Sequence, residues 1–382
     1  MENQLDIKCI DQTEFDGLEK EWNQLLARSS ADNVFLRWEW MHTWWDVFRK
    51  NRRLLVITAR SDGKLAAIAP FYIDRSGPLR TKTLRFCSDE LCPDYLDIIA
   101  EKAHESEAVN AICAFLQKDH RNDWDMMALE NLRSDSKLPA NPMLLNHHNH
   151  HTQHSFVCSY IKINGSFDNY WSARPSLRSE LSRQQRKLFN EKRIRHVPIR
   201  DEQILAKAME DLFFLHAKRV KDKNIVSRFT AADVRRFHQT LAPALLKNGI
   251  LNLHLIYHGD SPVSAIYCFN YNNKVYFFQS GFDPHWGKRS VGSVLLRLVI
   301  REAFEKRFEE FDFLKGDEGY KTFWTNASRR ESELIIYNQT FRGAFGHAMK
   351  IMKARIRHLT NIREDSGAPV GLEKAIGAPR HP

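Results

Sequence analysis

The chain has 382 residues, and its 57 lysines and arginines exceed its 47 aspartates and glutamates to give a net charge of +10. This length is greater than that of one ordinary domain and predicts two domains of about 150 to 200 residues each. No apolar run approaches the roughly 18 residues of a membrane-spanning helix, and the polar, acidic amino terminus lacks the pattern of a signal peptide. We therefore expect a cytoplasmic protein.

The net charge limits the class of partner only in part, and the cysteines indicate the redox state of the thiols. A positive net charge indicates an anionic partner, and coenzyme phosphates, nucleic acid, charged glycans and anionic lipid all meet that condition. The six cysteines are scattered without a C-x-x-C spacing. We expect reduced thiols, rather than a disulfide framework or a zinc site.

The first part of the chain predicts two helices followed by a β-hairpin. Residues 22–26 fit a first helix, and residues 35–48 place several tryptophans at helical spacing. Such a stripe is typical of a core-facing helix, and a carbohydrate-stacking platform is the alternative. The apolar runs 54–59 and 65–72 are separated by Ser-Asp-Gly-Lys, which is a hairpin turn signal. The later elements are a strand at 83–86 or 95–99, a helix over 107–116 and a strand at 125–129.

Residues 136–155 are expected to link two domains, because they carry two prolines and a run of histidines. The histidine spacing suits no closed coordination sphere, and no acidic or cysteine partner is near it in the sequence, so no metal is expected. The expected domains are residues 1–135 and 156–340. A basic terminal helix and a disordered tail rich in Gly and Pro are expected over 341–382.

The second half repeats the order of elements in the first. It predicts a strand at 156–163, a strongly basic helical stretch over 174–196, a helix at 205–218 and strands at 253–257 and 263–269. A shift of 198 residues places Asp62 on Asp260 and Leu65 on Val263. We interpret this similarity as an internal duplication of one α/β unit.

The stretch from Lys274 to Lys321 predicts a strand, a basic loop, a helix and a second strand. These elements are residues 275–278, 284–289, 290–304 and 311–314. The first N–H groups of a helix have no internal partner and lie at the positive end of its dipole. A loop with Lys288, Arg289 and Gly292 ahead of the helix therefore indicates a phosphate or pyrophosphate site. In the first half, an acidic loop takes this place and would repel phosphate.

Residues 289–294 (RSVGSV) resemble the R-x-x-G-x-G/A loop with which GNAT acyltransferases hold coenzyme A, with a departure at Val294. The strings FFQSGFD at 277–283 and DFLKGDE at 312–318 resemble the CelD/BcsL-like GNAT family of cellulose and exopolysaccharide gene clusters. That family is distantly similar to the FemABX aminoacyltransferases, and the resemblance extends over about residues 22–330. It implies an α/β (α+β) fold of two tandem GNAT-like units, each a mixed, mostly antiparallel sheet flanked by helices.

The resemblance implies an acyl-CoA thioester, in particular acetyl-CoA, as co-substrate and no tightly bound cofactor. The thioester would lie in a gap between residues 275–281 and 311–314. The residues expected to contact the coenzyme are Gln279, Ser280, Gly281, Lys288, Arg289, Ser290, Val291, Gly292 and Ser293. No nucleophile with a recognisable base partner is present, so direct transfer is expected.

Catalysis is expected from the residues that follow the last strand of this stretch. Glu318 is the first candidate for the base, with Asp317 and Asp283 as other candidates, and Tyr320 or Lys321 would serve as acid or charge clamp. The alternative for the two carboxylates at 317 and 318 is a structural turn. In that turn they would pair with Lys315, Lys321 or Arg329.

The expected acceptor is an amine or hydroxyl of a sugar, lipid or polysaccharide precursor. Its expected contacts are Asp94, Tyr95, Asp97, Arg183, Arg186, Arg219 and Trp324. For the two aspartates a turn or cap is the alternative, and for the basic helix a solvated face. Residues 342–359 form a basic amphipathic helix that would pack on the body or contact an anionic membrane. The alternative functions are a FemABX-like transfer from aminoacyl-tRNA, the one case with a nucleic-acid partner, and a non-catalytic accessory role in exopolysaccharide assembly.

Overall fold

The computed structural model describes residues 5–76, 79–91, 93–146, 148–191, 194–316 and 318–364. The described chain forms two compact units. Unit 1 holds the residues up to 156 together with those from 330 onward, and unit 2 holds residues 157–329. The start of unit 2 at residue 157 lies one residue from the expected start at 156. The boundaries expected at 135 and 340 differ from this division, because the supposed linker and residues 330–340 both belong to unit 1.

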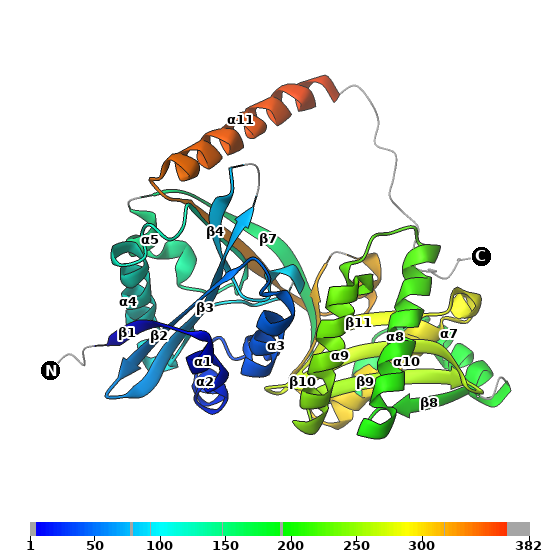
Figure 1. Cartoon of the computed structure of the whole chain (residues 1–382). Coiled ribbons are helices and arrows are strands. Elements are labelled where there is room, and N and C mark those ends of the chain that lie inside the picture. Colours follow the sequence, from blue (N-terminus) through cyan, green and yellow to red (C-terminus); the bar gives the residue numbers. More distant parts are fainter. Residues whose placement is uncertain are drawn as a thin grey trace. The chain divides into compact units, whose positions relative to one another are not determined.

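Unit 1 contains two strand-rich segments that are far apart in the sequence (Figure 1). Its elements are β1 (Asp6–Ile10), α1 (Gln12–Asp16), α2 (Glu19–Leu26), α3 (Trp38–Phe48), β2 (Arg53–Ser61), β3 (Lys64–Ser76), β4 (Thr81–Phe86), β5 (Ile99–Ala100), α4 (Glu105–Lys118), β6 (Met126–Leu132), α5 (Pro142–Leu145), the start of β7 (Asn149–Lys162), most of β13 (Ala327–Tyr337) and α11 (Phe341–Glu364). The strand order is β1-β2-β3-β4-β6-β13, and β5 pairs with β3.

The strand beside β6 in the unit 1 sheet comes from the carboxyl-terminal part of the chain. This strand is β13, and it pairs antiparallel with β6. Each of its ladder hydrogen bonds ties residues 332–337 to unit 1. This pairing is the physical reason that the expected domain boundary at 340 fails.

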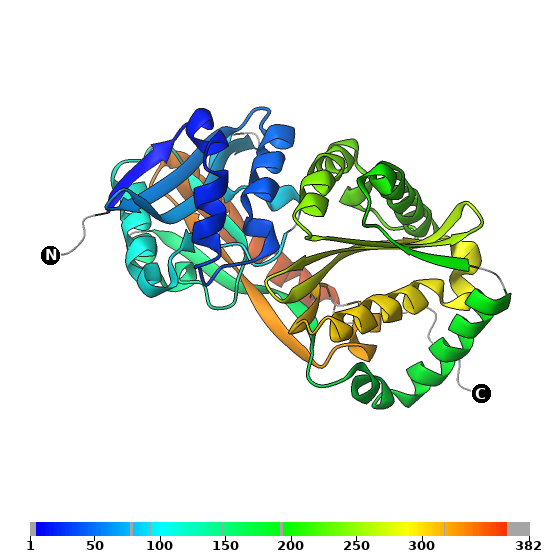
Figure 2. The ribbon, with the colours of Figure 1, turned by 90° about the horizontal axis from the view of Figure 1, so that it is seen from below.

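Unit 2 contains the remaining elements. They are the end of β7, α6 (Phe167–Ser172), α7 (Pro175–Arg186), β8 (Ile194–Pro198), α8 (Glu202–Asp222), α9 (Ala232–Lys247), β9 (Leu251–His258), β10 (Ser261–Tyr271), β11 (Lys274–Phe282), α10 (Val291–Glu305), β12 (Glu310–Lys315) and the first residues of β13. The strand order is β8-β9-β10-β11-β12-β7. Figure 2 shows α8 and α9 on one face of this sheet and α7 and α10 on the other.

The two sheets have the same topology, which confirms two tandem units of one fold. In each unit, three antiparallel pairings lead to a parallel pairing, β4 with β6 and β11 with β12, and a further antiparallel pairing follows. Each unit also runs strand, helices, hairpin, strand, helix, strand. This order is that of a mixed, mostly antiparallel sheet flanked by helices.

The two hairpins correspond with a shift of 197 residues, one less than the sequence comparison indicated. Ser61 pairs with Lys64 at the first turn, and His258 pairs with Ser261 at the second. Both hairpins then skip one residue, Ala66 in β3 and Val263 in β10. The skipped residue forms a β-bulge in each hairpin. The shift of 198 residues aligned apolar residues across these bulges. It is one residue out of register with the structure, and a one-residue slip exchanges the two faces of a strand.

The aromatic stripe of α3 lies in the core of unit 1, as predicted. Trp40 and Trp44 are fully buried, and Trp44 packs against Tyr72 of β3 with ring centroids 4.9 Å apart. Trp38 stacks on His42 on the same helix. The alternative of an open carbohydrate platform does not fit this burial. Among the described helices, none combines the length and the hydrophobicity that spanning a bilayer requires.

Candidate active site

The parallel strands β11 and β12 pair only at their beginnings. Their register is limited to Lys274 with Glu310, Val275 with Phe311 and Tyr276 with Asp312. Beyond Tyr276, β11 continues to Phe282 and stays paired only with β10, so its other edge has no strand partner. This divergence leaves one edge of β11 without a neighbouring strand at the point where the two strands separate.

Helix α10 begins directly beside the end of β11 and lacks a side-chain cap. The short 3-10 helix Pro284–Arg289 leads to Ser290, whose φ of 52° and ψ of 33° turn the chain into α10. The N–H groups of Val291, Gly292 and Ser293 find no acceptor among the described residues. A positive helix end with free N–H groups is suited to an anion.

The predicted basic loop surrounds this helix start. Lys288 is exposed, and the Arg289 guanidinium lies 5.2 Å from the centre of the Trp286 ring. A Cβ atom added at Gly292 would lie 3.5 Å from the Phe282 ring, which is an ordinary contact. Gly292 is therefore not required by the packing of the protein itself, and its lack of a side chain leaves room for a ligand.

Lys321 is a buried cation at the end of β12. Its Nζ donates to the carbonyl oxygens of Leu314 (3.3 Å), Lys315 (2.9 Å) and Gly316 (3.3 Å), and the side chain is only 5% exposed. Nζ also lies 2.8 Å from Oε2 of Glu318. Lys321 therefore holds the turn after β12 together and has no free proton-donating role.

Glu318 forms the ion pair that the sequence left as the alternative to catalysis, although its side chain stays 54% exposed. Asp317, the second predicted base, lies outside the described residues. Burial, together with the nearby charge of Glu318, raises the pKa of Tyr320 well above its usual value. The Tyr320 hydroxyl has no hydrogen-bond partner among the described residues, so it remains a protonated donor.

Helix α8 is fixed against β11 through Ser280, which was predicted to contact the coenzyme. The carbonyl of Ser280 accepts from Nδ1 of His216 (3.1 Å) and from Nη1 of Arg219 (3.3 Å), and its hydroxyl accepts from the same Nη1 (2.9 Å). Nε2 of His216 accepts from the Ser227 hydroxyl, and burial lowers the pKa of His216. His216 is thus a neutral, packed histidine, and Ser280 orients Arg219.

Gly281 is buried against the backbone of α8. A Cβ atom there would lie 2.6 Å from the carbonyl carbon of Leu215 and would contact the backbone of His216 as closely. The neighbouring Gln279 uses its Oε1 to accept from the Ser280 N–H (2.9 Å). Gly281 therefore serves the packing of α8 on β11, and this role accounts for the glycine without a coenzyme contact.

Residues 175–322 match the family model of the acetyltransferase (GNAT) domain. The matched segment includes the start of α10, the divergence of β11 and β12, and the turn with Glu318, Tyr320 and Lys321. The GNAT match supports an acyltransferase in unit 2. A search of curated protein sequences finds no significant match.

Solved structures share the fold over nearly the whole described chain. FemX has a TM-score of 0.62 at 11% identity and covers 87% of this chain and 98% of its own. The C-terminal domain of a protein assigned as a lysylphosphatidylglycerol synthetase from Agrobacterium fabrum has a TM-score of 0.52 at 10% identity, covering 90% and 96%. L-PGS from Bacillus licheniformis has a TM-score of 0.52 at 9% identity, covering 88% and 96%. At these identities the likeness shows the fold.

Within the GNAT segment, Asp283 is committed to structure. It accepts from the backbone N–H of His285 (3.1 Å) at the start of the short 3-10 helix, and Nζ of Lys218 lies 2.7 Å from its Oδ2. Partial burial raises its pKa, but the bonds from Lys218 and His285 outweigh it and lower the pKa to about 2. A general base should have a pKa near the working pH, so Asp283 is a poor candidate.

Three residues predicted to bind the acceptor belong to unit 1 and are buried there. Asp97 accepts from Nε of Arg133 (2.6 Å) and from the Ser136 hydroxyl (3.0 Å), although burial still raises its pKa. Tyr95 has a φ of 63°, and its N–H donates to Oε1 of Glu331 at 2.7 Å. These contacts show structural roles for Asp97 and for the Tyr95 backbone.

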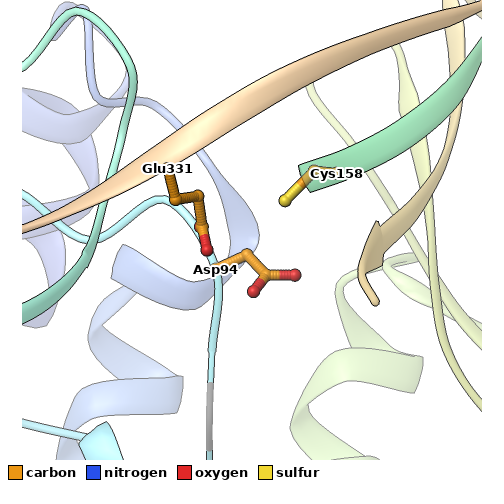
Figure 3. Close-up of side chains that lie close together, drawn as sticks. All are labelled: Asp94, Cys158 and Glu331. Atoms are coloured by element: carbon orange, nitrogen blue, oxygen red, sulfur yellow. The ribbon is translucent and has the colours of Figure 1, made fainter. Parts of the chain in front are cut away.

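Asp94 lies beside Glu331 in the same unit (Figure 3). A carboxylate oxygen of each lies within 4.8 Å of the other, and both side chains are buried. Cys158, also labelled in Figure 3, belongs by sequence to unit 2. Burial makes Asp94 inaccessible to a large acceptor.

The remaining predicted acceptor contacts divide between core and surface. Trp324 is buried and stacks on Trp171 with ring centroids 5.8 Å apart, so it belongs to the core of unit 2. Arg183 is exposed and pairs with Glu180 at 2.5 Å, and Arg186 is exposed on the same helix, α7. Of the predicted acceptor contacts, only Arg219 lies at the end of α8, where its charge acts on Tyr320.

Lys223 is a charged group near the site that the sequence did not single out. Burial and Arg219 lower its pKa against the opposing effects of Asp222 and Glu318. Its signal in the sequence was weak, because it is one of several basic residues in and directly after the last turns of α8. Only the fold brings this cation near Glu318.

Proposed function

We propose that unit 2 transfers an acyl group from a coenzyme A thioester, in particular acetyl-CoA, directly to an amine or hydroxyl. The observation that carries this proposal is the uncapped start of α10 at the point where β11 and β12 diverge. Both features lie within the segment that matches the GNAT domain. Free N–H groups and basic side chains are suited to the pyrophosphate, and the unpaired edge of β11 is suited to the extended thioester arm.

The proposed reaction is one displacement at the thioester carbonyl. The acceptor nitrogen or oxygen attacks the carbonyl carbon, the new bond forms, and the carbon–sulfur bond breaks. Glu318 takes the proton from the acceptor, and Tyr320 gives its hydroxyl proton to the leaving sulfur. A backbone N–H group at the edge of β11 that faces the gap stabilises the developing oxyanion. Proton exchange with water then restores both side chains.

Coenzyme binding tests the first step directly. We expect coenzyme A and acetyl-CoA to raise the melting temperature of the wild-type chain, because a ligand that binds the folded state stabilises it. Gly292→Asp should abolish this shift, since a carboxylate at the helix start repels phosphate and fills the space that Gly292 leaves. Calorimetric titration should show that the affinity for coenzyme A falls at least a hundredfold, because the new carboxylate repels the pyrophosphate.

Gly249→Asp is the matched control for this experiment. It adds the same charge in unit 2, at the other end of β9 from the turn to β10, where an added Cβ meets nothing within 4 Å. Its basal stability will be somewhat lower because Gly249 has a φ of 68°. Its coenzyme-induced shift should match that of the wild type. Equal affinity in the Gly292→Asp variant would remove the pyrophosphate site from the proposal.

Replacing Tyr320 by phenylalanine should lower turnover by about a hundredfold while leaving the dissociation constant of acetyl-CoA unchanged. The raised pKa of Tyr320 keeps it protonated, so the wild-type rate should not fall through its ionisation up to about pH 10. The pH dependence of kcat and a parallel binding titration test both points. Unchanged turnover in the variant would show that the leaving thiolate takes its proton elsewhere.

We infer a sugar, lipid or polysaccharide precursor as acceptor from the resemblance of residues 277–283 and 312–318 to the CelD/BcsL-like family. Arg219 is the proposed acceptor contact, because it lies at the end of α8 near Tyr320. The exposed Arg183 and Arg186 of α7 are proposed to meet an anionic part of the acceptor.

A FemABX-like transfer from aminoacyl-tRNA is the second candidate. The fold likeness to FemX, which covers 98% of that chain, supports it. Salt-dependent tRNA binding, without any shift of the melting temperature by coenzyme A, would favour this donor. A wild-type chain that binds neither donor would instead support the non-catalytic accessory role.

A further inference from the structure

Helix α11 packs on unit 1 through its glycines. The first turn is tied down by Thr340, whose hydroxyl donates to Oδ1 of Asp125 (2.8 Å) and accepts from the Gly343 N–H (3.0 Å). A Cβ atom at Gly343 would lie 2.6 Å from the carbonyl oxygen of Asp125. One turn later, a Cβ atom added at Gly346 would lie 3.5 Å from the ring of Tyr337. The glycine face of the helix is therefore the face that meets the protein.

The aromatic face of α11 is turned to solvent. Phe341, Phe345 and Met352 are 81%, 44% and 47% exposed, and their spacing of four and seven residues places them on one face. Ile351 is exposed as well, at 42%. No other helix in the described ranges has more than two exposed large apolar side chains. Amphipathic helices usually pack by their apolar face, so this orientation is reversed.

Basic residues far outnumber acidic ones in the sequence of α11. Between Phe341 and Glu364 the sequence carries six lysines and arginines and a single acidic residue. The basic residues are Arg342, Lys350, Lys353, Arg355, Arg357 and Arg363. An exposed apolar face on a strongly basic helix matches the chemistry of an anionic lipid surface, where acyl chains accept the apolar groups and headgroups attract the cations.

We propose that α11 is a membrane-surface helix that docks the protein on an anionic bilayer. Phe341, Phe345 and Met352 enter the boundary between headgroups and acyl chains, and the exposed Arg342 contacts anionic headgroups. Burial of the exposed side chains supplies the apolar part of the affinity, and the basic residues supply a salt-sensitive part. This inference concerns a surface of unit 1, and it stands or fails independently of acyl transfer by unit 2.

Co-sedimentation of the full chain with lipid vesicles tests the proposal. The probe is a vesicle of equal parts phosphatidylglycerol and phosphatidylcholine, with pure phosphatidylcholine as the neutral comparison. We expect binding to the anionic vesicles that weakens with added salt, and little binding to the neutral ones. Met352→Asp should lower the affinity by about tenfold, because it removes one buried apolar side chain and adds a repelled charge.

Met143→Asp is the matched control, since Met143 of α5 is 48% exposed and also belongs to unit 1. It should bind like the wild type. Absence of wild-type binding, or an equal loss in the two variants, would overturn the proposal. Self-association of the wild type that Met352→Asp abolishes, seen by light scattering without lipid, would assign the face to a second copy of the chain and would equally overturn it.

Discussion

Gly281→Ala is expected to destabilise unit 2 by about 3 kcal/mol. The new methyl group would meet the backbone of Leu215 and His216, and backbone cannot rotate away as a flexible side chain can. Relief requires α8 to move off β11, which would break the bonds from His216 and Arg219 to Ser280. Thermal unfolding followed by circular dichroism should show a melting temperature lower by about 10 °C for a unit of this size.

Gly319→Ala is the control for this stability effect. It also adds one methyl group within unit 2, but an added Cβ there meets nothing within 4 Å, and its backbone has no left-handed φ. Its melting temperature should stay within about 2 °C of the wild type. If Gly281→Ala is as stable as this control, the backbone of α8 does not lie in close contact with Gly281. Coenzyme binding by a stable Gly281→Ala chain would then be the next measurement.

Glu318→Gln is expected to lower kcat by a hundredfold or more while leaving the affinity for acetyl-CoA unchanged. The amide cannot accept a proton from the acceptor, but its oxygen can still accept the bond from Lys321. Lys321 would keep its three carbonyl partners at the end of β12. The turn should therefore hold its shape, and the loss should appear in kcat and not in the melting temperature.

Glu305→Gln provides the matched comparison for the chemical effect. Glu305 is 57% exposed and pairs with Arg301 at 2.7 Å, which resembles the exposure and pairing of Glu318. It lies at the carboxyl end of α10, away from the start of that helix, and should keep full turnover. A Glu318→Gln enzyme with wild-type kcat and a lowered melting temperature would show that the ion pair with Lys321 is the whole role of Glu318.

Local patterns in the sequence predicted the elements well. The apolar runs around Asp62 and Asp260 form the hairpins β2–β3 and β9–β10, and the helical period after Ser290 forms α10. The tryptophan stripe is core. These features depend on contacts between near neighbours in the chain, where hydrophobic periodicity and turn chemistry carry the information.

Individual side-chain roles were harder to predict because they depend on distant partners. Asp97 looked like an acceptor ligand, but Arg133 lies beside it. Gly281 looked like a coenzyme contact, but α8, more than fifty residues earlier in the sequence, covers it. A motif gives the type of residue at a position, and burial then decides whether that residue meets a ligand or the protein itself.

The sequence by itself determined the class of the fold, the duplicated order of elements and the basic helix start that points to a diphosphate. Only the tertiary structure decided that β13 joins the sheet of unit 1 beside β6, that the buried Lys321 donates to three carbonyl groups, and that α11 turns its phenylalanines outward. The physical reason is the range of the interactions. Periodicity and capping act over a few residues, whereas strand pairing and burial join segments that only folding brings together.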